Sequence, residues 1–483
     1  MTKVIMVQGS GSNVGKSIIV AGLCRLFTKT GLKVRPFKPQ NMSNNAAVTI
    51  DNGEIGRAQA LQAWACNCDA TTDMNPILLK PESEFGSQVI VQGKRFATLQ
   101  AKDYVKQKPL LLGKTLESFD RLKKTADLII IEGAGSPAET NLRKGDIANM
   151  GFAEAADVPV IILGDIDRGG VIAQLVGTHA VISSQDKKRV VGFLINKFRG
   201  DPNLFTDGLT DIVRRTGWKS LGILPWFDSA WKLPAEDIVG IRGTKGGIIK
   251  IVVPKLSRIS NFDDLDPLRL EKNVSIEIIE AGKPLPGDAQ LILIPGSKST
   301  ISDLEFMRLQ GWDIDILAHI RRGGHVLGVC GGYQILGNSI SDPDNIESKA
   351  KQVSGLGLLN VSTIMKPEKN LKTVSGSHLK SGKPITGYEM HIGMTNGPDC
   401  KNPLLEINGK ASGAIAQNGR VYGCYLHGMF ASDAFRKSFL DGLGASSTLE
   451  NYEDSVSETL DELAEHLESN MNTELFLNLA KIT

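Results

Sequence analysis

Short runs of aliphatic residues alternate with stretches of helical periodicity over the first half of the chain. Each run has about the length of a buried strand, and several end in a polar or glycine-rich turn. Unbroken aliphatic runs are typical of parallel strands that are covered on both faces. We therefore predict an α/β domain with a doubly wound parallel sheet over residues 1–232. The runs are 4–7, 127–132, 158–165, 190–196 and 222–226, with a shorter one that starts at Val34.

A second series of the same kind follows residues 233–247, which are rich in Gly, Pro and charge and are typical of a linker. Aliphatic runs at 248–253, 274–279, 291–294 and 325–329 predict a second α/β domain over residues 248–450. From 451 to 483 the chain is acidic with apolar residues at helical spacing, and we expect an amphipathic helical tail that packs on the protein rather than on a partner. The apolar positions are Leu460, Leu463, Leu467, Met471 and Leu475.

Composition narrows the class of function. Among 483 residues the hydrophobic share is 41% and the net charge is +2. This balance indicates a globular protein and argues against a nucleic acid or a membrane surface as its main partner. No apolar run approaches the ~20 residues of a spanning helix, and the chain opens on a strand-like segment instead of a signal peptide, so we expect a cytoplasmic protein. Six scattered cysteines predict neither a disulfide framework nor a zinc site.

A phosphate-binding loop follows the first strand, with the sequence Gly-Ser-Gly-Ser-Asn-Val-Gly-Lys-Ser over residues 9–17. Backbone N–H groups of such a loop and of the following helix cradle phosphate. Lys16 is expected to reach the outer phosphates of a nucleotide, and the hydroxyl of Ser17 to ligate Mg²⁺. The first glycine stands one place early, and in this the loop resembles the dethiobiotin synthetase group of P-loop enzymes. The predicted nucleotide-binding residues of the loop are Gly11, Ser12, Asn13, Val14, Gly15, Lys16 and Ser17.

Polar groups at the ends of later strands extend this site. Glu132 closes the run 127–132 and occupies the place of the strand-end acid that holds Mg²⁺ in P-loop enzymes. Asn196 belongs to an Asn-Lys pair after a late strand, and we expect it to bond a purine base because an amide matches a purine edge. A helix start is the alternative for Asn196. The predicted cofactors are therefore ATP and Mg²⁺.

The segment that begins at Val34 leaves its strand as an amide-rich loop, at the sheet edge where α/β proteins bind ligands. Lys38, Gln40 and Asn41 are expected to bind the substrate there. Asp51 is a candidate second carboxylate for Mg²⁺, with Glu54 as the other choice. A helix cap with solvated charges is the alternative for both acids.

The second half of the chain carries the pattern of a nucleophile elbow. Cys330 stands between glycines directly after the run 325–329, where a strand turns sharply into a helix. The thiol would project near the first N–H groups of that helix, so Gly331 is expected to stabilise an oxyanion, and the loop at Gly296 to supply a second N–H group. His427 ends a later apolar run and is the expected base. A buried structural cysteine is the alternative.

In chain order, the oxyanion loop, the elbow and the late histidine resemble the class I glutamine amidotransferases, in which the cysteine attacks the side-chain amide of glutamine and releases ammonia. That family usually places a glutamate two residues after the histidine, and Met429 stands there. The third member of the catalytic site therefore stays open. A Gly-Tyr-Glu-Met-His-Ile-Gly stretch from residue 387 also resembles the family and implies that Glu389 and His391 bind substrate. A structural His–Glu pair is the alternative.

Over its whole length the chain is similar to the cobyric acid synthases, chiefly through residues 37–42 and 53–59. The resemblance implies amidation of the b, d, e and g carboxylates of adenosylcobyrinic acid a,c-diamide in cobalamin biosynthesis, through an acyl phosphate and ammonia from glutamine. The partners would be the corrinoid carboxylate, glutamine and ATP. Alternatives are the cobyrinic acid a,c-diamide synthase, an amidotransferase for a cell-wall carboxylate, and a partitioning-type ATPase that works as a switch. Such a switch has no need for Cys330 and His427.

Overall fold

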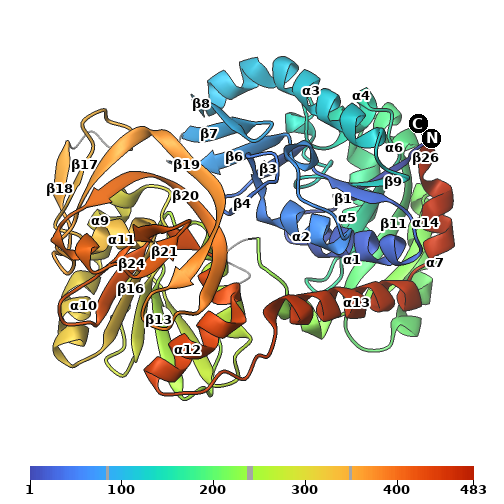
Figure 1. Cartoon of the computed structure of the whole chain (residues 1–483). Helices are drawn as coiled ribbons and strands as arrows, with labels where there is room; N and C mark the ends of the chain where they lie inside the picture. The colour runs from blue at the N-terminus through green and yellow to red at the C-terminus, as the bar shows by residue number, and fades with distance from the viewer. Residues whose placement is uncertain (83–85, 237–242, 348–350) are drawn as a thin grey trace. The chain divides into compact units, whose positions relative to one another are not determined.

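The computed structural model describes residues 1–82, 86–236, 243–347 and 351–483, and the chain forms two compact units (Figure 1). The first unit comprises Met1–Glu236 and Val456–Thr483, and the second comprises Asp237–Ser455. The first unit thus extends to residue 236 rather than the expected 232. Of the expected linker 233–247, residues 237–242 lie outside the described residues. The expected tail 451–483 is not a separate part, because most of it belongs to the first unit.

A parallel sheet forms the centre of the first unit, with the strand order β12-β11-β10-β1-β9-β2 and with β26 antiparallel to β1. Strands that follow β1 in the chain lie on both sides of it, so the predicted doubly wound sheet is confirmed. The strands are β1 (Lys3–Gly9), β2 (Val34–Phe37), β9 (Leu128–Glu132), β10 (Val160–Asp165), β11 (Val190–Phe198), β12 (Lys219–Pro225) and β26 (Lys481–Ile482).

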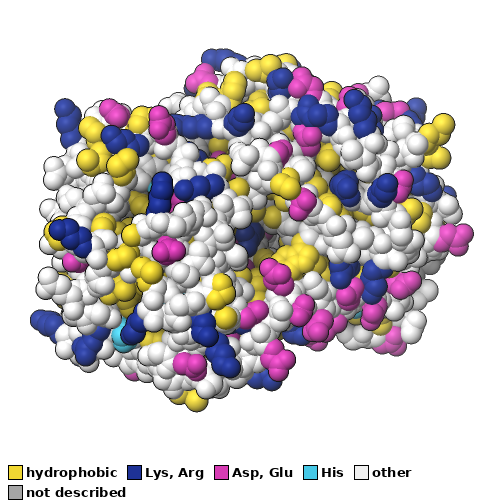
Figure 2. Space-filling view, viewed as in Figure 1, with side chains coloured by type: hydrophobic (Ala, Val, Ile, Leu, Met, Phe, Trp, Pro, Cys, Tyr) yellow, Lys and Arg dark blue, Asp and Glu magenta, His cyan; other side chains and the backbone are white. Residues whose placement is uncertain are grey.

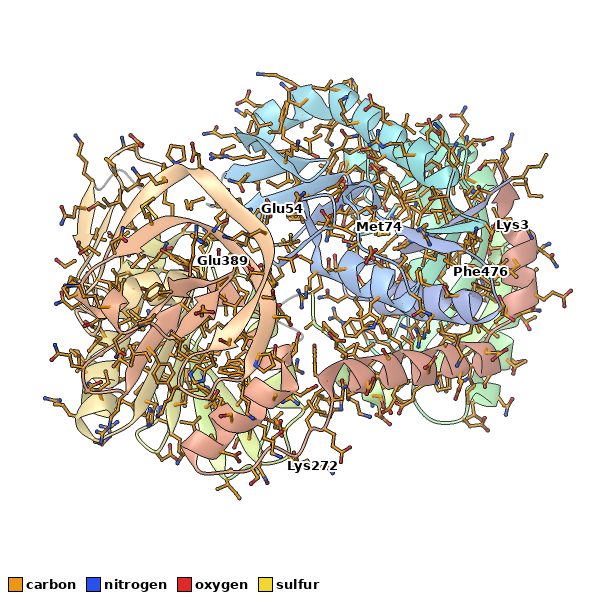
Figure 3. The ribbon with its side chains drawn as sticks, viewed as in Figure 1. Lys3, Glu54, Met74, Lys272, Glu389 and Phe476 are labelled. Atoms are coloured by element: carbon orange, nitrogen blue, oxygen red, sulfur yellow. The ribbon has the colours of Figure 1, made fainter. Side chains whose placement is uncertain are left out.

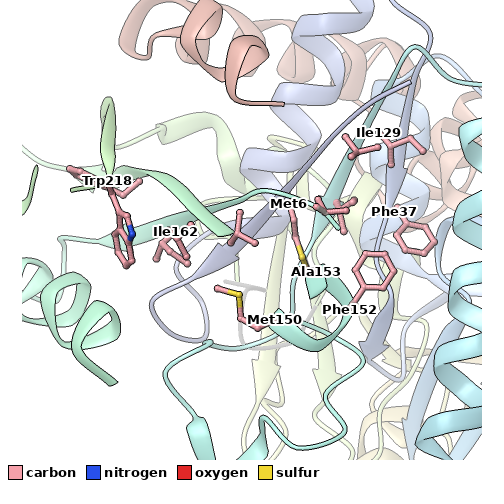
Figure 4. Packing of buried hydrophobic residues seen from close by; sticks show 14 of the residues in the cluster. Met6, Phe37, Ile129, Met150, Phe152, Ala153, Ile162 and Trp218 are labelled. Atoms are coloured by element: carbon pink, nitrogen blue, oxygen red, sulfur yellow. The ribbon is translucent and has the colours of Figure 1, made fainter. Parts of the chain in front are cut away.

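Helices cover this sheet and bury its aliphatic side chains (Figures 1 and 4). Phe37 of β2 packs against Phe119 and Phe152, with ring centroids 5.2 and 5.5 Å away. Met6, Ile129 and related side chains continue the same core. The helices are α1 (Lys16–Lys29), α2 (Arg57–Ala65), α3 (Ala101–Lys123), α4 (Met150–Ala155), α5 (Val171–Val181), α6 (Ser184–Arg189), α7 (Thr206–Thr216), α13 (Tyr452–Asn470) and α14 (Thr473–Leu479).

The last helices of the chain pack on α1. Arg25 forms a two-pronged ion pair with Asp461 at 3.0 and 3.1 Å, and Phe27 stacks on Phe476 with ring centroids 5.5 Å apart. Lys3 donates to the carbonyl oxygen of Leu477 at 3.0 Å (Figure 3). The amphipathic helix therefore buries its apolar side on the first unit, which agrees with the expected packing on the protein.

Two smaller sheets lie beside the main one in the first unit. The larger has the order β3-β6-β7-β8, and the other pairs β4 with β5. They follow the polar loop after β2 and precede α3, so they stand near the carboxyl ends of the main strands. Their strands are β3 (Gln40–Met42), β4 (Ala46–Val48), β5 (Glu54–Gly56), β6 (Ile77–Pro81), β7 (Gly86–Val91) and β8 (Lys94–Gln100).

The second unit has its own mostly parallel sheet, with the order β14-β13-β15-β16-β24-β23. Only β23 runs antiparallel to its neighbour among these strands. The predicted runs become β13 (Ile249–Pro254), β14 (Val274–Ile279), β15 (Leu291–Ile294) and β16 (His325–Val329), joined by β23 (Ala414–Ile415) and β24 (Val421–Cys424). The predicted second α/β domain is confirmed. Its helices are α8 (Asp266–Arg269), α9 (Thr300–Leu309), α10 (Trp312–Arg321), α11 (Gly331–Leu336) and α12 (Asp433–Leu443).

A second sheet, which the hydrophobic pattern did not predict, is built around a long antiparallel pair in the same unit. The order is β18-β17-β19-β20-β25, with β21 and β22 attached to β19. Strand β25 ends at His427 and pairs with β20, so this sheet brings the histidine next to residues 388–389. The strands are β17 (Ser339–Ser341), β18 (Gln352–Ser354), β19 (Ser362–His378), β20 (Pro384–Asn396), β21 (Leu405–Ile407), β22 (Lys410–Ser412) and β25 (Leu426–His427).

None of the helices in the described ranges is long and apolar enough to cross a membrane. Basic and acidic side chains are interspersed over the face shown in Figure 2, which agrees with the nearly balanced charge of the chain.

Candidate active sites

The loop between β1 and α1 has the backbone form of an anion cradle. Gly15, the residue before α1, has φ of 99°, in the left-handed region that favours glycine. A Cβ atom there would also lie 2.5 Å from Nδ2 of Asn196. Helix α1 begins at Lys16, so its first N–H groups point toward the loop. The predicted nucleotide-binding residues 11–17 therefore stand where a phosphate chain can meet a helix N-terminus.

The ammonium of Lys16 lies within this loop. It donates to the carbonyl oxygen of Gly11 at 3.2 Å and to that of Gly135, in the loop after β9, at 3.3 Å. Burial lowers the pKa of Lys16, against the nearby carboxylate of Glu132. A desolvated cation whose hydrogen-bond partners in the described ranges are carbonyl oxygens is well suited to an incoming phosphate.

Ser17 and Lys38 meet at the carboxylate of Glu132. Oε1 of Glu132 accepts from Oγ of Ser17 at 2.7 Å and from Nζ of Lys38 at 2.9 Å. Oε2 accepts from Gln62 at 2.6 Å and from Gln59 at 3.3 Å. Burial alone would raise the pKa of Glu132, but Lys38 and these hydrogen bonds hold it below its usual value. The predicted acid is thus a buried carboxylate in contact with the predicted hydroxyl.

A second carboxylate at this point, Glu236, was not predicted. Its Oε2 accepts from Oγ of Ser17 at 3.0 Å, and its Oε1 accepts from Asn41 at 2.8 Å and from Lys38 at 3.4 Å. Its carbonyl oxygen accepts from Asn45 at 2.7 Å. Burial would lower the pKa of Lys38, but Glu132 and then Glu236 raise it. Lys38 therefore binds both acids that converge on Ser17, and Asn41 binds one of them, Glu236.

The two acids that were proposed for this role have other partners. Asp51 accepts from Oγ1 of Thr72 at 2.6 Å and from its backbone N–H at 3.2 Å, and no described hydrogen bond or ion pair joins it to Ser17 or Glu132. Glu54 is buried and forms an ion pair with Lys80 at 2.7 Å (Figure 3). The carboxylate of Asp51 anchors the turn at Thr72, and its role as a magnesium ligand stays a prediction.

Asn196 and Gln40 both have hydrogen-bond partners within the protein. Nδ2 of Asn196 donates to the carbonyl oxygen of Val14 at 2.8 Å, so in this structure the amide supports the phosphate loop. The next residue, Lys197, donates to the carbonyl oxygen of Asn13 at 2.6 Å. Gln40 accepts a hydrogen bond from the hydroxyl of Tyr104. A base contact by Asn196 and a substrate contact by Gln40 stay predictions.

Cys330 has the backbone of a nucleophile elbow. It lies between β16 and α11 with φ of 54° and ψ of −108°, a strained conformation for a residue with a Cβ atom. Its side chain is buried, and Sγ lies 3.5 Å from the carbonyl oxygen of Met390 on β20. The thiol is therefore at the carboxyl end of the parallel sheet and beside the second sheet.

His427 is held by an aspartate from a distant part of the chain. Nδ1 of His427 lies 2.9 Å from Oδ2 of Asp264, and Oδ1 of Asp264 accepts from the N–H of Gly428 at 2.6 Å. Nε2 of the fully buried ring has no hydrogen-bond partner among the described residues. Burial alone would lower the pKa of His427, but Asp264 and the nearby Cys330 raise it well above its usual value. Asp264 thus makes the contact with His427 that a third member of the site would make.

The two predicted oxyanion positions lie against this group. A Cβ atom on Gly296 would be 3.0 Å from Cε1 of His427, and one on Gly331 would be 2.8 Å from the backbone N of Ser297. The loop after β15 is therefore in contact both with the histidine and with the start of α11. Backbone N–H groups from these two segments can face one developing oxyanion.

Glu389 and His391 flank Met390 on β20; Glu389 is labelled in Figure 3. Glu389 accepts from Asn370 at 2.8 Å and pairs with Lys372 at 3.1 Å. Nδ1 of His391 lies 2.9 Å from the carbonyl oxygen of Gly393, and its ring stacks on Tyr425. Burial lowers the pKa of His391 to about 4. His391 is thus neutral at physiological pH and is anchored by its own strand, so its role toward substrate stays a prediction.

Each of the two units matches a known protein family. Residues 5–240 match the CobQ/CobB/MinD/ParA nucleotide binding domain, and residues 250–435 match the CobB/CobQ-like glutamine amidotransferase domain. The chain is similar to the cobyric acid synthase of Bradyrhizobium diazoefficiens, with 58% identity over 100% of both chains. It is also similar to that of Ruegeria sp., with 60% identity over 99% of this chain and 98% of the relative.

Proposed function

Because the chain belongs to the cobyric acid synthase family, we propose that it couples ATP cleavage to amidation of the b, d, e and g carboxylates of adenosylcobyrinic acid a,c-diamide. Ammonia would come from glutamine. The observation that carries the proposal is the presence of two distinct sites in one chain. One is the Cys330, His427 and Asp264 group, and the other is the Lys16, Ser17 and Glu132 group.

The second unit has the groups that glutamine hydrolysis needs. His427 takes the thiol proton of Cys330 at Nε2, and the thiolate attacks the amide carbon of glutamine. N–H groups near Gly296 and Gly331 stabilise the oxyanion, and the protonated His427 gives its proton to the leaving nitrogen, so ammonia departs. Water then cleaves the thioester with His427 as base, which yields glutamate and restores the thiol. Asp264 orients the ring and stabilises its charged form.

The first unit has the groups that phosphoryl transfer needs. A corrinoid carboxylate oxygen attacks the γ-phosphorus of ATP, ADP leaves, and an acyl phosphate forms. Lys16 and the N–H groups of the loop offset the charge on the transferred group. Ammonia attacks the acyl carbon, phosphate leaves, and a proton passes to solvent as the amide forms. Lys38 pairs with Glu132 and Glu236 and so holds these two carboxylates together beside Ser17.

The residues at Ser17 fit Mg²⁺. Three oxygen-bearing side chains converge there, since Oγ of Ser17 lies 2.7 Å from Glu132 and 3.0 Å from Glu236, and Mg²⁺ is usually held by one or two carboxylates together with phosphate and water. Glu132, Glu236 and Ser17 would hold the ion, with Glu236 rather than Asp51 as the second carboxylate ligand. When bound, Mg²⁺ supplies neutralisation of the charge on the phosphate oxygens.

Two alternative functions have less support. The family relatives are cobyric acid synthases over the full chain, which does not favour the a,c-diamide synthase. A partitioning-type switch would leave the buried Asp264, His427 and Cys330 group without a task.

The test is to supply purified full-length protein with ATP, Mg²⁺, glutamine and either adenosylcobyrinic acid a,c-diamide or cobyrinic acid. Mass spectrometry of the corrinoid counts the amides formed, and ADP and glutamate are measured in parallel. The proposal expects four amides on the a,c-diamide. Amidation of only the a and c positions of cobyrinic acid would contradict it.

A further inference from the structure

A cavity of about 510 Å³ lies within the first unit, beside the nucleotide loop. Its walls come from β3, from β6 and β7, from the start of α3 and from the loop that follows β9. Sites for small molecules usually measure roughly 300–1,000 Å³. The cavity is thus large enough to take a sizeable part of an organic ligand.

The cavity has an apolar floor and an apolar opening. Leu79, Val89 and Ile147 on the floor are buried and belong to one hydrophobic cluster. Met42, Val105 and Leu142 also line the cavity, yet they are 59%, 58% and 56% exposed. Large apolar side chains from three separate segments that converge on one opening mark a surface that an apolar ligand face covers.

One end of the cavity is formed by the segments that carry the phosphoryl-transfer groups. Ser136 lines it and follows Glu132 on the loop whose Gly135 carbonyl oxygen accepts from Lys16 at 3.3 Å. Gln40 lines it as well and follows Lys38 by two residues. A carboxyl group at this end would lie next to the nucleotide loop.

Lys108 lines the cavity, and its ammonium can pair with a ligand. It is half-buried, and throughout the described ranges no side chain forms an ion pair or hydrogen bond with its ammonium. Arg143, the other cation of the lining, is already bound by Asp186 at 2.9 Å and by Glu154 at 2.7 Å. Lys108 is therefore the cation that is available to a carboxylate of a bound ligand.

We propose that this cavity is the acceptor site for the corrinoid, an inference that rests on the proposed function. The apolar face of the ring covers Met42, Val105 and Leu142, while the reacting carboxylate reaches the end at Ser136. The substrate carries four carboxylates that await amidation, so a second one can pair with Lys108 during each of the first three turns. As amides replace carboxylates, this attraction weakens, which favours release of the finished product.

The test measures binding of adenosylcobyrinic acid a,c-diamide to the full chain without ATP, by calorimetry. The double variant Met42→Asp/Leu142→Asp places charges at exposed positions of the opening, and we expect its Kd to rise at least tenfold. Lys108→Ala should raise the Kd for this substrate about fivefold and leave the Kd for the tetra-amidated product nearly unchanged. Ala101→Trp, which adds bulk at an exposed lining position, should also weaken binding.

Two control positions lie on α3, the helix that carries Lys108, but outside the lining of the cavity. Leu110→Asp changes an apolar residue that is 50% exposed, and Lys106→Ala removes an exposed cation that already pairs with Asp103 at 2.9 Å. Both should bind the corrinoid as wild type does. Glutamine hydrolysis and ATP binding, measured in every variant, report that each unit is folded.

The outcomes separate the two proposals. If wild type binds and amidates the corrinoid while the double variant and Lys108→Ala bind it equally well, the acceptor site lies elsewhere and the proposed function stands. If wild type neither binds nor amidates a corrinoid, the proposed function fails, and this inference fails with it.

Discussion

Oδ2 of Asp264 lies 2.9 Å from Nδ1 of His427, although 163 residues separate the two in the chain. The same carboxylate accepts the N–H of Gly428 through its other oxygen, so both oxygens are engaged. The usual position for the acid, two residues after the histidine, holds the buried apolar Met429. We propose that Asp264, from the turn Phe262–Leu265, takes the role of the glutamate that the family usually places after the histidine.

Asp264→Asn tests this pairing. Without the carboxylate the pKa of His427 falls and its charged form loses its partner, so glutamine hydrolysis should drop on the order of 10²–10⁴-fold. Synthesis from free ammonia should persist. Initial rates with each nitrogen donor give both numbers. Hydrolysis at the wild-type rate would mean that Asp264 has only a structural role.

Glu236→Gln tests whether Glu236 or Asp51 is the second carboxylate that holds Mg²⁺. Because the carboxylate touches Ser17 and Lys38, its loss should weaken Mg²⁺-dependent ATP binding about tenfold or more and slow amide synthesis with either donor. Asp51→Asn is the matched control, since that acid bonds Thr72 and Thr49 rather than Ser17, and the variant should bind ATP as wild type does. Calorimetry of ATP with and without Mg²⁺ is the measurement. If Asp51→Asn weakened Mg²⁺-dependent ATP binding and Glu236→Gln did not, Asp51 would be the magnesium ligand.

His391 predicts a pH dependence of stability. Burial lowers its pKa to about 4 in the folded chain, whereas an exposed histidine titrates near 6.5. Between these values the unfolded chain binds the extra proton, so the free energy of unfolding should fall as pH drops from about 6.5 to about 4, by on the order of 3 kcal/mol. His391→Gln should remove this part of the dependence. Urea unfolding of both proteins at pH 7.5 and pH 5 checks it, and an equal loss in both would exclude His391 as the cause.

The hydrophobic pattern predicts most strands of the two parallel sheets because those strands are local aliphatic runs, whereas β24, with the sequence Val-Tyr-Gly-Cys, is not one and was not predicted. It does not predict the long pair β19 and β20, whose residues are largely polar and partly exposed. An antiparallel sheet with a solvated face leaves no continuous apolar run to detect.

The motif residues could be found because phosphate loops and nucleophile elbows constrain neighbouring positions in the chain. Asp264 and Glu236 have no such local signal. Each becomes part of a site only through folding, over 163 residues to His427 and over 219 residues to Ser17. Glu236 also lies in a Gly- and Pro-rich region whose composition indicates a linker, and the packing of α13 on α1 depends on contacts between opposite ends of the chain.

The most direct measurement compares Cys330→Ala and Lys16→Ala with wild type, by following corrinoid amide, ADP and glutamate with glutamine or with concentrated ammonia as donor. Cys330→Ala should lose amidation from glutamine and keep it from ammonia, because the groups at Ser17 and Glu132 are untouched. Lys16→Ala should lose amidation from both donors, since its charge acts on the transferred phosphoryl group. If Cys330→Ala still uses glutamine, or if it remains folded and loses ammonia-dependent synthesis as well, the assignment of two separate half-reactions to these two sites is wrong.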